Sequence, residues 1–312
     1  MKHFRNIHDV NDIPDLVMKG VRLSKDIQAK IGQGKTLGLI FLNSSLRTKM
    51  STQKAAMNLG MSCLLVEATS GWPLEFEDGV VMNADRPEHI KEAAAVLSQY
   101  CDILGLRAFP SLTDQQKDYQ DYVFNQFAKY ATVPVISLES AIYHPLQALA
   151  DMITIEQHKT IAKPKIVLSW APHIKALPQA VSNSFVQWSR AMNHDLTIAC
   201  PEGYDLSPEI VGDTPIIHDQ RTAFRDADFV YVKNWSSFEK YGQVLSKDKS
   251  WMISQENLSV TNSAKVMHCL PVRRNVVIAD DVMDSDQALM IPQAANREIS
   301  AQLILQEILS EL

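Results

Sequence analysis

The sequence has no long apolar run and no excess of basic charge. None of its apolar stretches approaches the ~18 residues that a membrane-spanning helix needs. Its start, MKHFRNIHDVNDIPD, lacks the apolar core of a signal peptide. A net charge of −6 argues against a surface for nucleic acid. We therefore expect neither a membrane nor a nucleic acid as partner, and an anionic small molecule would need a local basic cluster.

Cysteine is scarce as well. The four cysteines, Cys63, Cys101, Cys200 and Cys269, are scattered along the chain without the paired spacing of a metal site. This pattern is typical of a reducing, cytoplasmic setting, and it predicts no disulfide framework and no structural zinc.

The remaining composition is that of a globular protein. The chain has 312 residues, of which 46% are hydrophobic and 21% charged, with no low-complexity tract. This length suits two domains of ordinary size. Apolar runs alternate with amphipathic stretches, which predicts an α/β fold with two doubly wound parallel sheets.

The expected elements divide the chain into two similar halves. We expect domains at 1–143 plus a returning C-terminal helix at 293–312, and at 144–292, with residues 144–160 forming a helix that joins them. Other helices are expected at 87–100 and 120–131. The predicted strands lie at 35–43, 61–68, 101–108, 133–139, 164–170, 196–200, 228–235, 265–271 and 288–292.

The stretch FLNSSLRTKMSTQKAAMNLGM, residues 41–61, places hydroxyls and an arginine where a buried strand gives way to a helix. Ser44 or Ser45 can cap that helix, and Gly60 can end it. Apolar residues recur at helical spacing at Leu46, Met50 and Met57. Ser45, Arg47 and Thr48 would then lie at the positive end of the helix, which favours an oxyanion such as phosphate. Ordinary capping beside a solvated arginine is the alternative.

Other polar residues follow the ends of predicted strands, where ligands bind in parallel sheets. Each has a structural explanation, since Arg107 could be a surface residue, Glu139 and His144 could be caps, and Cys269 could be inert packing. Several arginines that converge from different strand ends nevertheless predict a di-anionic substrate and a reaction that develops charge. The strand-end set is Ser45, Arg47, Thr48, Arg107, Glu139, His144, Gln147, His173, Lys233, Cys269 and Arg273, with Arg297 opening the last helix.

Three of these segments carry a resemblance to the carbamoyltransferases. SSLRT is similar to the phosphate loop of that family, and HPLQ and HCLPVRR match its other two signatures in order. The cysteine in the last motif resembles the ornithine branch rather than the aspartate branch. VKNWSSFEK stands where true ornithine carbamoyltransferases have an Asp-x-x-x-Ser-Met-Gly loop, so the match is to enzymes of N-acylated ornithine. The segment 170–184, WAPHIKALPQAVSNS, resembles the proline-rich segment that knots their backbone.

Two positions bear on the acyl group. In the N-acetylornithine enzymes a glutamate corresponds to Pro87 and a lysine to Val277, and both departures resemble the N-succinyl-L-ornithine branch. A glutamate would repel the second carboxylate of a succinyl group, whereas proline does not. Pro87 could instead simply start a helix. An N-acetylornithine carbamoyltransferase and a non-catalytic carbamoyl-phosphate-binding relative stay as alternatives.

The resemblance implies transfer of the carbamoyl group of carbamoyl phosphate to the side-chain amine of N-succinyl-L-ornithine, in arginine biosynthesis. It implies that residues 1–143, with the helix at 293–312, bind carbamoyl phosphate and that residues 144–292 bind the N-acylornithine. It implies no metal and no organic cofactor. Either Cys269 or the departing phosphate could take the proton of the amine. Trp72, in SGWPLE, matches a loop tryptophan that reaches a neighbouring subunit, which implies a homotrimer with shared active sites. The implied catalytic residues are Arg107, His144 and Cys269. The implied carbamoyl phosphate site comprises Ser45, Leu46, Arg47, Thr48, Trp72, Arg107, His144, Gln147, Cys269, Leu270 and Arg297. The implied acyl-ornithine contacts are Glu139, His173, Lys233, Arg273 and Pro87.

Overall fold

The computed structural model describes residues 1–23, 30–68 and 72–312, so Ser70 and Gly71 of the SGWPLE motif lie outside the described residues. The chain forms two compact units: unit 1 is Met1–Leu149 with Arg297–Leu312, and unit 2 is Ala150–Asn296. Both boundaries fall inside helices, α6 (Pro145–His158) and α12 (Met290–Leu309). They differ by a few residues from the expected division, whose assignment of one substrate to each part stays a prediction.

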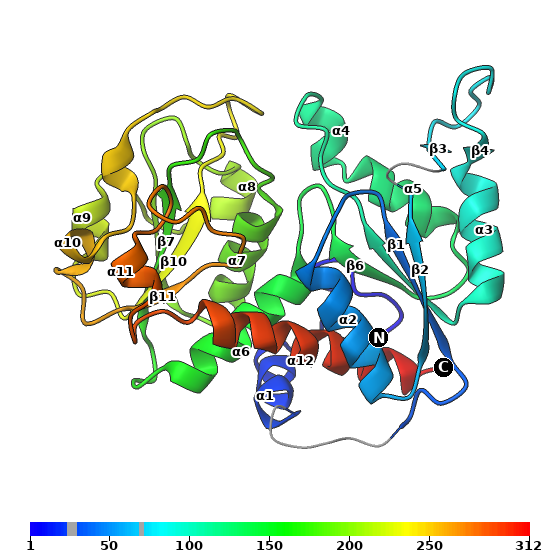
Figure 1. The fold of residues 1–312 in the computed structure, drawn as a ribbon, viewed down its shortest axis with the longest axis horizontal. Helices are drawn as coiled ribbons and strands as arrows, with labels where there is room; N and C mark the ends of the chain where they lie inside the picture. The colour runs from blue at the N-terminus through cyan, green and yellow to red at the C-terminus, as the bar shows by residue number, and fades with distance from the viewer. Residues whose placement is uncertain (24–29, 69–71) are drawn as a thin grey trace. The chain divides into compact units, whose positions relative to one another are not determined.

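Unit 1 is built on a four-stranded parallel sheet. Its strands are β1 (Thr36–Phe41), β2 (Ser62–Glu67), β5 (Ile103–Arg107) and β6 (Val135–Glu139), in the order β2-β1-β5-β6 (Figure 1). The strands β1, β5 and β6 are almost entirely buried. This explains why they read as continuous apolar runs without alternation.

Helices cover this sheet. Apolar residues of α3 (Ile90–Tyr100) and α5 (Tyr122–Tyr130), among them Ile90 and Phe127, form one core with Leu104 of β5. Unit 1 also contains the helices α1 (Ile13–Leu23), α2 (Arg47–Asn58) and α4 (Gln115–Tyr119). A short parallel pair, β3 (Leu74–Glu75) with β4 (Glu88–His89), lies beside α3 (Figure 1).

Unit 2 repeats the architecture with five parallel strands in the order β11-β10-β7-β8-β9. They are β7 (Lys165–Ala171), β8 (Asp195–Ala199), β9 (Ile216–Ile217), β10 (Phe229–Asn234) and β11 (Lys265–Met267). The largest helix that lies wholly in this unit, α7 (Ala180–Ala191), is buried along most of its length, and Phe185 stacks on Tyr231 of β10 at 4.0 Å. Shorter helices follow at α8 (Pro208–Val211), α9 (Gln220–Phe224), α10 (Gln255–Leu258) and α11 (Asp280–Met283).

The α/β class and the parallel sheets are thus confirmed, and three local predictions are wrong. Residues 288–292 are not a strand, because Ala288 makes only an isolated bridge to Val266 and α12 already begins at Met290. The helix expected from residue 87 begins at Ile90, with the His89 side chain as its cap. Neither predicted serine caps α2, whose N-cap position is Leu46 without a side-chain hydrogen bond.

The predicted end of α2 at Gly60 is confirmed. Gly60 has a φ of +81°, the left-handed conformation that glycine adopts without a steric cost. Its N–H donates to the Met57 carbonyl at 3.0 Å, and the next N–H, of Met61, returns to Ala56 at 3.0 Å.

Among the described residues, no helix is long and apolar enough to cross a membrane. The segment 170–184 comprises the end of β7, a connection and the start of α7. That this segment threads the backbone into a knot stays a prediction.

Candidate active site

The predicted site residues of unit 1 lie at the point where its strand order reverses. The chain passes from β1 to β2 on one side and later returns to β5 on the other, so β1 and β5 flank the switch point. Thr48 opens α2 shortly after β1, whereas Arg107 ends β5 and Glu139 ends the neighbouring β6.

Two guanidinium groups meet at one hydroxyl in this place. Arg107 Nη1 donates to Thr48 Oγ1 at 3.0 Å, and Arg297 Nη2, from α12, donates to the same oxygen at 3.3 Å. All three side chains are buried, with exposed fractions of 3 to 8%. A buried pair of arginines this close requires negative charge nearby, because guanidinium groups do not lose their protons in proteins.

Glu139 supplies part of that charge. Its Oε2 forms an ion pair with Arg107 Nη1 at 3.1 Å and lies 3.5 Å from His144 Nε2. Arg107 and Glu139 are partners across the strands β5 and β6. Glu139 was expected to contact the acyl-ornithine. In the structure it lies in the Arg107 group of unit 1, and the acyl contact stays a prediction.

Arg297 also fixes the first turn of α6. Its Nη1 donates to Gln147 Oε1 at 2.5 Å and lies 3.2 Å from His144 Nε2. Because a guanidinium can only donate, His144 Nε2 accepts in this arrangement and the neutral ring carries its proton on Nδ1. The pairing of Arg107, His144, Gln147 and Arg297 at one point agrees with their predicted grouping.

The start of α2 offers further donors to an anion. Ser45 and Arg47 are half-buried, and Leu46 is 72% exposed. The first backbone N–H groups of the helix, those of Arg47, Thr48 and Lys49, precede the first intrahelical bond from Met50 N–H to Leu46 O. Arg107 and Arg297 against the single Glu139 carboxylate leave this site with net positive charge, although the chain as a whole is acidic.

Sequence reasoning missed residues that hold this group in place. Asn43 Oδ1 accepts from the Phe109 N–H at 2.6 Å and so ties the segment after β1 to the segment after β5. The Arg107 guanidinium lies over the Phe109 ring, 4.4 Å from its centroid. Phe109 follows Arg107 by two residues, just after the end of β5. This spacing is the one feature of the sequence that could have indicated its contact with Arg107.

Asp121 was missed too. It lies in a buried left-handed position (φ +50°), and its Oδ1 accepts from the Ala141 N–H at 3.0 Å in the turn that leads to His144. That turn is closed by Ser140 N–H donating to Tyr143 O at 2.8 Å. Burial raises the pKa of Asp121 to about 6.

The predicted residues of unit 2 also lie around a reversal of strand order, between β7 and β10. His173 follows β7, and the buried Lys233 lies on β10 opposite Trp170. Arg273 Nε donates to His173 Nε2 at 3.3 Å, while His173 Nδ1 donates to Lys175 O at 2.9 Å. Burial lowers the pKa of His173, and the charges of Arg273 and Lys233 lower it further, so a neutral ring is favoured.

Trp235 was not predicted, yet it positions the His173 loop. Its Nε1 donates to the His173 carbonyl at 3.2 Å, and its ring stacks on Tyr204 at 5.3 Å. Cys269 and Leu270 are half-buried and follow β11, where Leu270 N–H donates to His268 Nδ1 at 2.8 Å. The Leu270–Pro271 peptide bond is cis.

Trp72 and Pro87, the two remaining predicted residues, are exposed neighbours at the β3–β4 pair of unit 1. Trp72 Nε1 donates to the carboxylate of Glu88, the residue after Pro87. Val277, by contrast, is fully buried in unit 2, where its N–H donates to Arg273 O at 2.9 Å. Its side chain packs in the interior, so the argument about the acyl group depends on Pro87.

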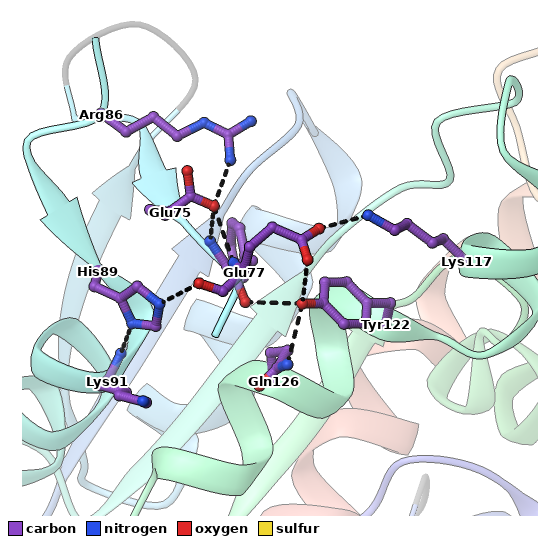
Figure 2. Close-up of polar contacts among 9 residues, drawn as sticks. Glu75, Glu77, Arg86, His89, Lys91, Lys117, Tyr122 and Gln126 are labelled. Atoms are coloured by element: carbon purple, nitrogen blue, oxygen red, sulfur yellow. Dashed lines mark hydrogen bonds and ion pairs between the residues drawn. The ribbon is translucent and has the colours of Figure 1, made fainter. Parts of the chain in front are cut away.

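A polar network holds the segment between Trp72 and α3 (Figure 2). Glu77 accepts from Lys117 Nζ at 2.5 Å and from the Tyr122 hydroxyl at 3.1 Å, which attaches the segment to α4 and α5. His89 Nδ1 accepts from Lys91 N–H at 3.1 Å, while its Nε2 donates to Glu77 O at 3.0 Å. The loop that carries Pro87 is therefore fixed to the body of unit 1.

Comparison with known proteins shows the family of the chain. Two family profiles match the chain: the carbamoyl-P binding domain of aspartate/ornithine carbamoyltransferase over residues 2–157, and the Asp/Orn binding domain of the same family over residues 178–307. The chain therefore belongs to the aspartate/ornithine carbamoyltransferase family, and it is a carbamoyltransferase.

The relatives of the chain indicate which members of this family it is most similar to. N-succinylornithine carbamoyltransferase of Bacteroides thetaiotaomicron is 48% identical, over 100% of both chains. N-acetylornithine carbamoyltransferase of Xylella fastidiosa is 35% identical, over 95% of both. A crystal structure of an N-acetyl-L-ornithine transcarbamylase variant, with a glutamate replaced by proline and with carbamyl phosphate and N-succinyl-L-norvaline bound, matches with a TM-score of 0.93 at 33% identity, over 99% of this chain and 100% of that one. The resemblance predicted from the motifs is confirmed.

Proposed function

We propose that the chain transfers the carbamoyl group of carbamoyl phosphate to the side-chain amine of N-succinyl-L-ornithine. The products are N-succinyl-L-citrulline and phosphate. The shared Thr48 hydroxyl, with Arg107 and Arg297 on it, is the observation that carries the first substrate, because this buried group combines fixed positive charge with the N-terminus of α2. The 48% identity to an N-succinylornithine carbamoyltransferase supports the second substrate.

In this proposal the phosphate binds to Ser45, Arg47, Thr48, Arg297 and the backbone of Leu46. Arg107, Thr48 and His144 then face the carbamoyl oxygen as it becomes an oxyanion, and Gln147 with the carbonyls near Cys269 and Leu270 holds the carbamoyl NH₂. Removing one donor to such an oxyanion typically costs ~10²–10³ in rate.

His144 and Arg297 are coupled in this scheme. His144 Nε2 can donate to the carbamoyl oxygen only when Arg297 Nη1 no longer donates to it from 3.2 Å. A phosphate that draws the Arg297 guanidinium away therefore allows the ring proton of His144 to move from Nδ1 to Nε2. Binding of the phosphate would thus prepare the group that polarises the carbonyl.

The chemical step forms one bond and breaks another. The neutral amine attacks the carbamoyl carbon, the carbonyl electrons move to oxygen, and their return expels phosphate. An alkyl ammonium of pKa ~10 must lose one proton before attack. The second proton leaves the nitrogen after attack, to the departing phosphate or to Cys269.

For the second substrate we propose the basic groups of unit 2. Lys233 and Arg273 suit the α-carboxylate and the succinyl carboxylate, and neutral His173 can accept from an amide N–H. Glu139 lies with Arg107, so its proposed contact would be with the incoming amine. Pro87 leaves the succinyl group without an opposing charge, which agrees with the glutamate-to-proline variant of a relative that binds N-succinyl-L-norvaline.

We also propose a trimer with shared sites and a cytoplasmic location. β2 lies at the edge of its sheet, and Leu64, Leu65 and Val66 on it are 37–48% exposed. The apolar face of α2, predicted from Leu46, Met50 and Met57, is exposed rather than packed in the core. An apolar edge strand beside an apolar helix face fits a second copy of this chain.

Ureido-product formation from carbamoyl phosphate tests the function, with ornithine, N-acetylornithine and N-succinylornithine assayed in parallel. We expect turnover of the succinyl compound and little with the other two. Turnover of the acetyl compound alone would reject the succinyl specificity and keep the carbamoyl phosphate site. No product from any of the three would reject catalysis and favour a binding protein.

A further inference from the structure

We infer that Cys200, Asp205 and His218 of unit 2 form a binding site for a divalent cation of the zinc class. One ligand atom from each residue lies within 4.8 Å of the other two. The three residues are separate from every group that the proposed reaction uses.

The distances suit such an ion. Cys200 Sγ lies 3.7 Å from Asp205 Oδ1 and 3.9 Å from His218 Nδ1. Around tetrahedral zinc, with bonds of 2.0 to 2.3 Å, neighbouring ligand atoms lie ~3.5 Å apart. The Cys200 sulfur therefore needs to approach each of the other two ligand atoms by only a few tenths of an ångström. The ligand atoms of Asp205 and His218 already lie within 4.8 Å of each other.

The backbone brings these residues together from two neighbouring strands. Cys200 directly follows β8, and His218 directly follows β9, which pairs with β8 through Ala199 and Ile217. Between Cys200 and Asp205 the chain turns at Gly203, whose φ of +79° favours glycine. This turn brings Asp205 back toward Cys200. Two strand ends and one turn thus fix the ligand set independently of any ion.

The chemistry of the set selects the ion. A thiolate, an imidazole and one carboxylate suit zinc or cobalt, whereas magnesium and calcium prefer oxygen ligands alone. Cys200 is fully buried and His218 is exposed, so a fourth position would open to water. The neighbouring Asp219 is already used, because it caps α9 by accepting from Thr222 N–H at 2.7 Å.

Binding requires two proton movements. Burial raises the pKa of the Cys200 thiol, so the ion must displace a proton from the sulfur. His218 Nδ1 donates to Cys200 O at 2.9 Å, and it becomes a ligand by shifting its proton to the exposed Nε2. Both changes lower the affinity of the site for the ion.

An ion here would act on the segment that follows Lys233. Phe238 N–H donates to Asp205 O at 3.1 Å, and Ser237 Oγ donates to Gly203 O at 2.6 Å. The Tyr204 hydroxyl accepts from Leu245 N–H at 2.7 Å. The Cys200–Asp205 turn thus holds residues 237–245 at several points, and an ion that tightens the turn tightens this segment.

The test is a titration of the chelator-treated full chain with Co²⁺, followed by displacement with Zn²⁺. We expect one equivalent of cobalt, with a thiolate-to-cobalt charge-transfer band that zinc removes. Cys200→Ala should abolish the band, and Cys63→Ala, which removes a thiol from unit 1, should leave it unchanged. His218→Ala should weaken zinc binding at least by the ~10- to 100-fold that loss of an outer-shell partner costs.

Several results would overturn the inference. They are the absence of a charge-transfer band, a band that persists in Cys200→Ala, and zinc affinity unchanged in both His218→Ala and Asp205→Asn. The last two variants change exposed or half-buried residues, so they decide the matter even if Cys200→Ala fails to fold. Zinc should also slow amide hydrogen exchange at Tyr204 and Phe238, and unchanged exchange at both would reject the placement of the ion on this turn.

Discussion

Arg107 and Arg297 donate to one oxygen, Thr48 Oγ1, at 3.0 and 3.3 Å. Two guanidinium groups repel each other, and one shared hydroxyl does not offset the free energy of burying both of them. Glu139 offsets one of the two charges, and the other remains to attract an anion. The arrangement is therefore suited to a ligand that carries more than one negative charge.

Thr48 should be essential to turnover through its hydroxyl. Thr48→Val keeps the shape of the side chain and removes the oxygen that both arginines share. We expect kcat to fall by ~10²–10³, the range for loss of one oxyanion donor. Thr48→Ser retains the hydroxyl and should keep most of the activity. Steady-state kinetics on both variants would check this, and wild-type turnover by Thr48→Val would contradict the proposed site.

Asp121 should give the chain a measurable pH dependence of stability. Its folded-state pKa of about 6 lies above the ~3.9 of an unfolded aspartate. The folded state therefore binds the proton more tightly, so this stabilisation is complete below the unfolded pKa and is lost as pH rises through 6.

The matched variant is Asp121→Asn, which tolerates the left-handed backbone and keeps an acceptor for Ala141 N–H. From about pH 7.5 to about pH 4.5, the wild type should gain roughly 2 kcal/mol of unfolding free energy relative to the variant. Denaturant unfolding at the two pH values measures this difference. Parallel pH profiles for the two proteins would show that Asp121 does not titrate as described.

Pro87 should determine tolerance of the succinyl group. In Pro87→Glu we expect kcat/KM for N-succinylornithine to fall on the order of tenfold, because like charges about 4 Å apart repel by ~1–4 kcal/mol between bulk water and a protein surface. Asn83→Glu adds the same charge at another exposed position and should have little effect. Equal losses in both variants would point to net charge rather than to position 87.

Shared active sites predict complementation between inactive variants. Trp72→Ala and His144→Asn should each be nearly inactive alone. When the two are unfolded and reassembled together in equal amounts, about a quarter of the sites in a trimer would combine an intact Trp72 with an intact His144 of another copy. Activity near zero after mixing would indicate that each chain completes its own site.

The exposed edge of β2 should hold copies of the chain together. Leu65→Glu places a charge on this apolar edge. In sedimentation velocity we expect monomers for this variant and a trimer for the wild type. Val96→Glu changes an aliphatic side chain of similar exposure on α3, 44% against 43%, and should leave the trimer intact. A monomeric wild type would reject the assembly.

Much of the fold was predictable because its central strands are buried on both faces. The apolar runs at β1, β5, β6, β7 and β10 have neither the polar face of a solvent-exposed helix nor the alternating polar residues of a half-buried strand. Polar residues at the ends of such runs must then gather at one edge of the sheet, which is how Arg107 and His144 could be grouped without coordinates.

Other features depend on tertiary contacts that a local pattern does not contain. Residues 288–292 are as apolar as a strand, but they enter a buried helix. Met50 and Met57 have the spacing of a core-facing helix, yet they lie on its exposed face, and Thr52 with Ala55 turns inward instead. The Cys200 set could not be predicted, because its three residues have no motif spacing and meet only through strand pairing.

The helix α12 has a consequence for the order in which the molecule matures. Arg297–Leu312 belongs to unit 1, yet the ribosome makes these residues only after all of unit 2. The nascent first unit therefore lacks its C-terminal helix while some 150 residues are synthesised. These residues can fold meanwhile as a unit of their own. Arg297 is the last polar group to reach the Thr48 hydroxyl, so a growing chain acquires its anion site as one of its final acts of folding.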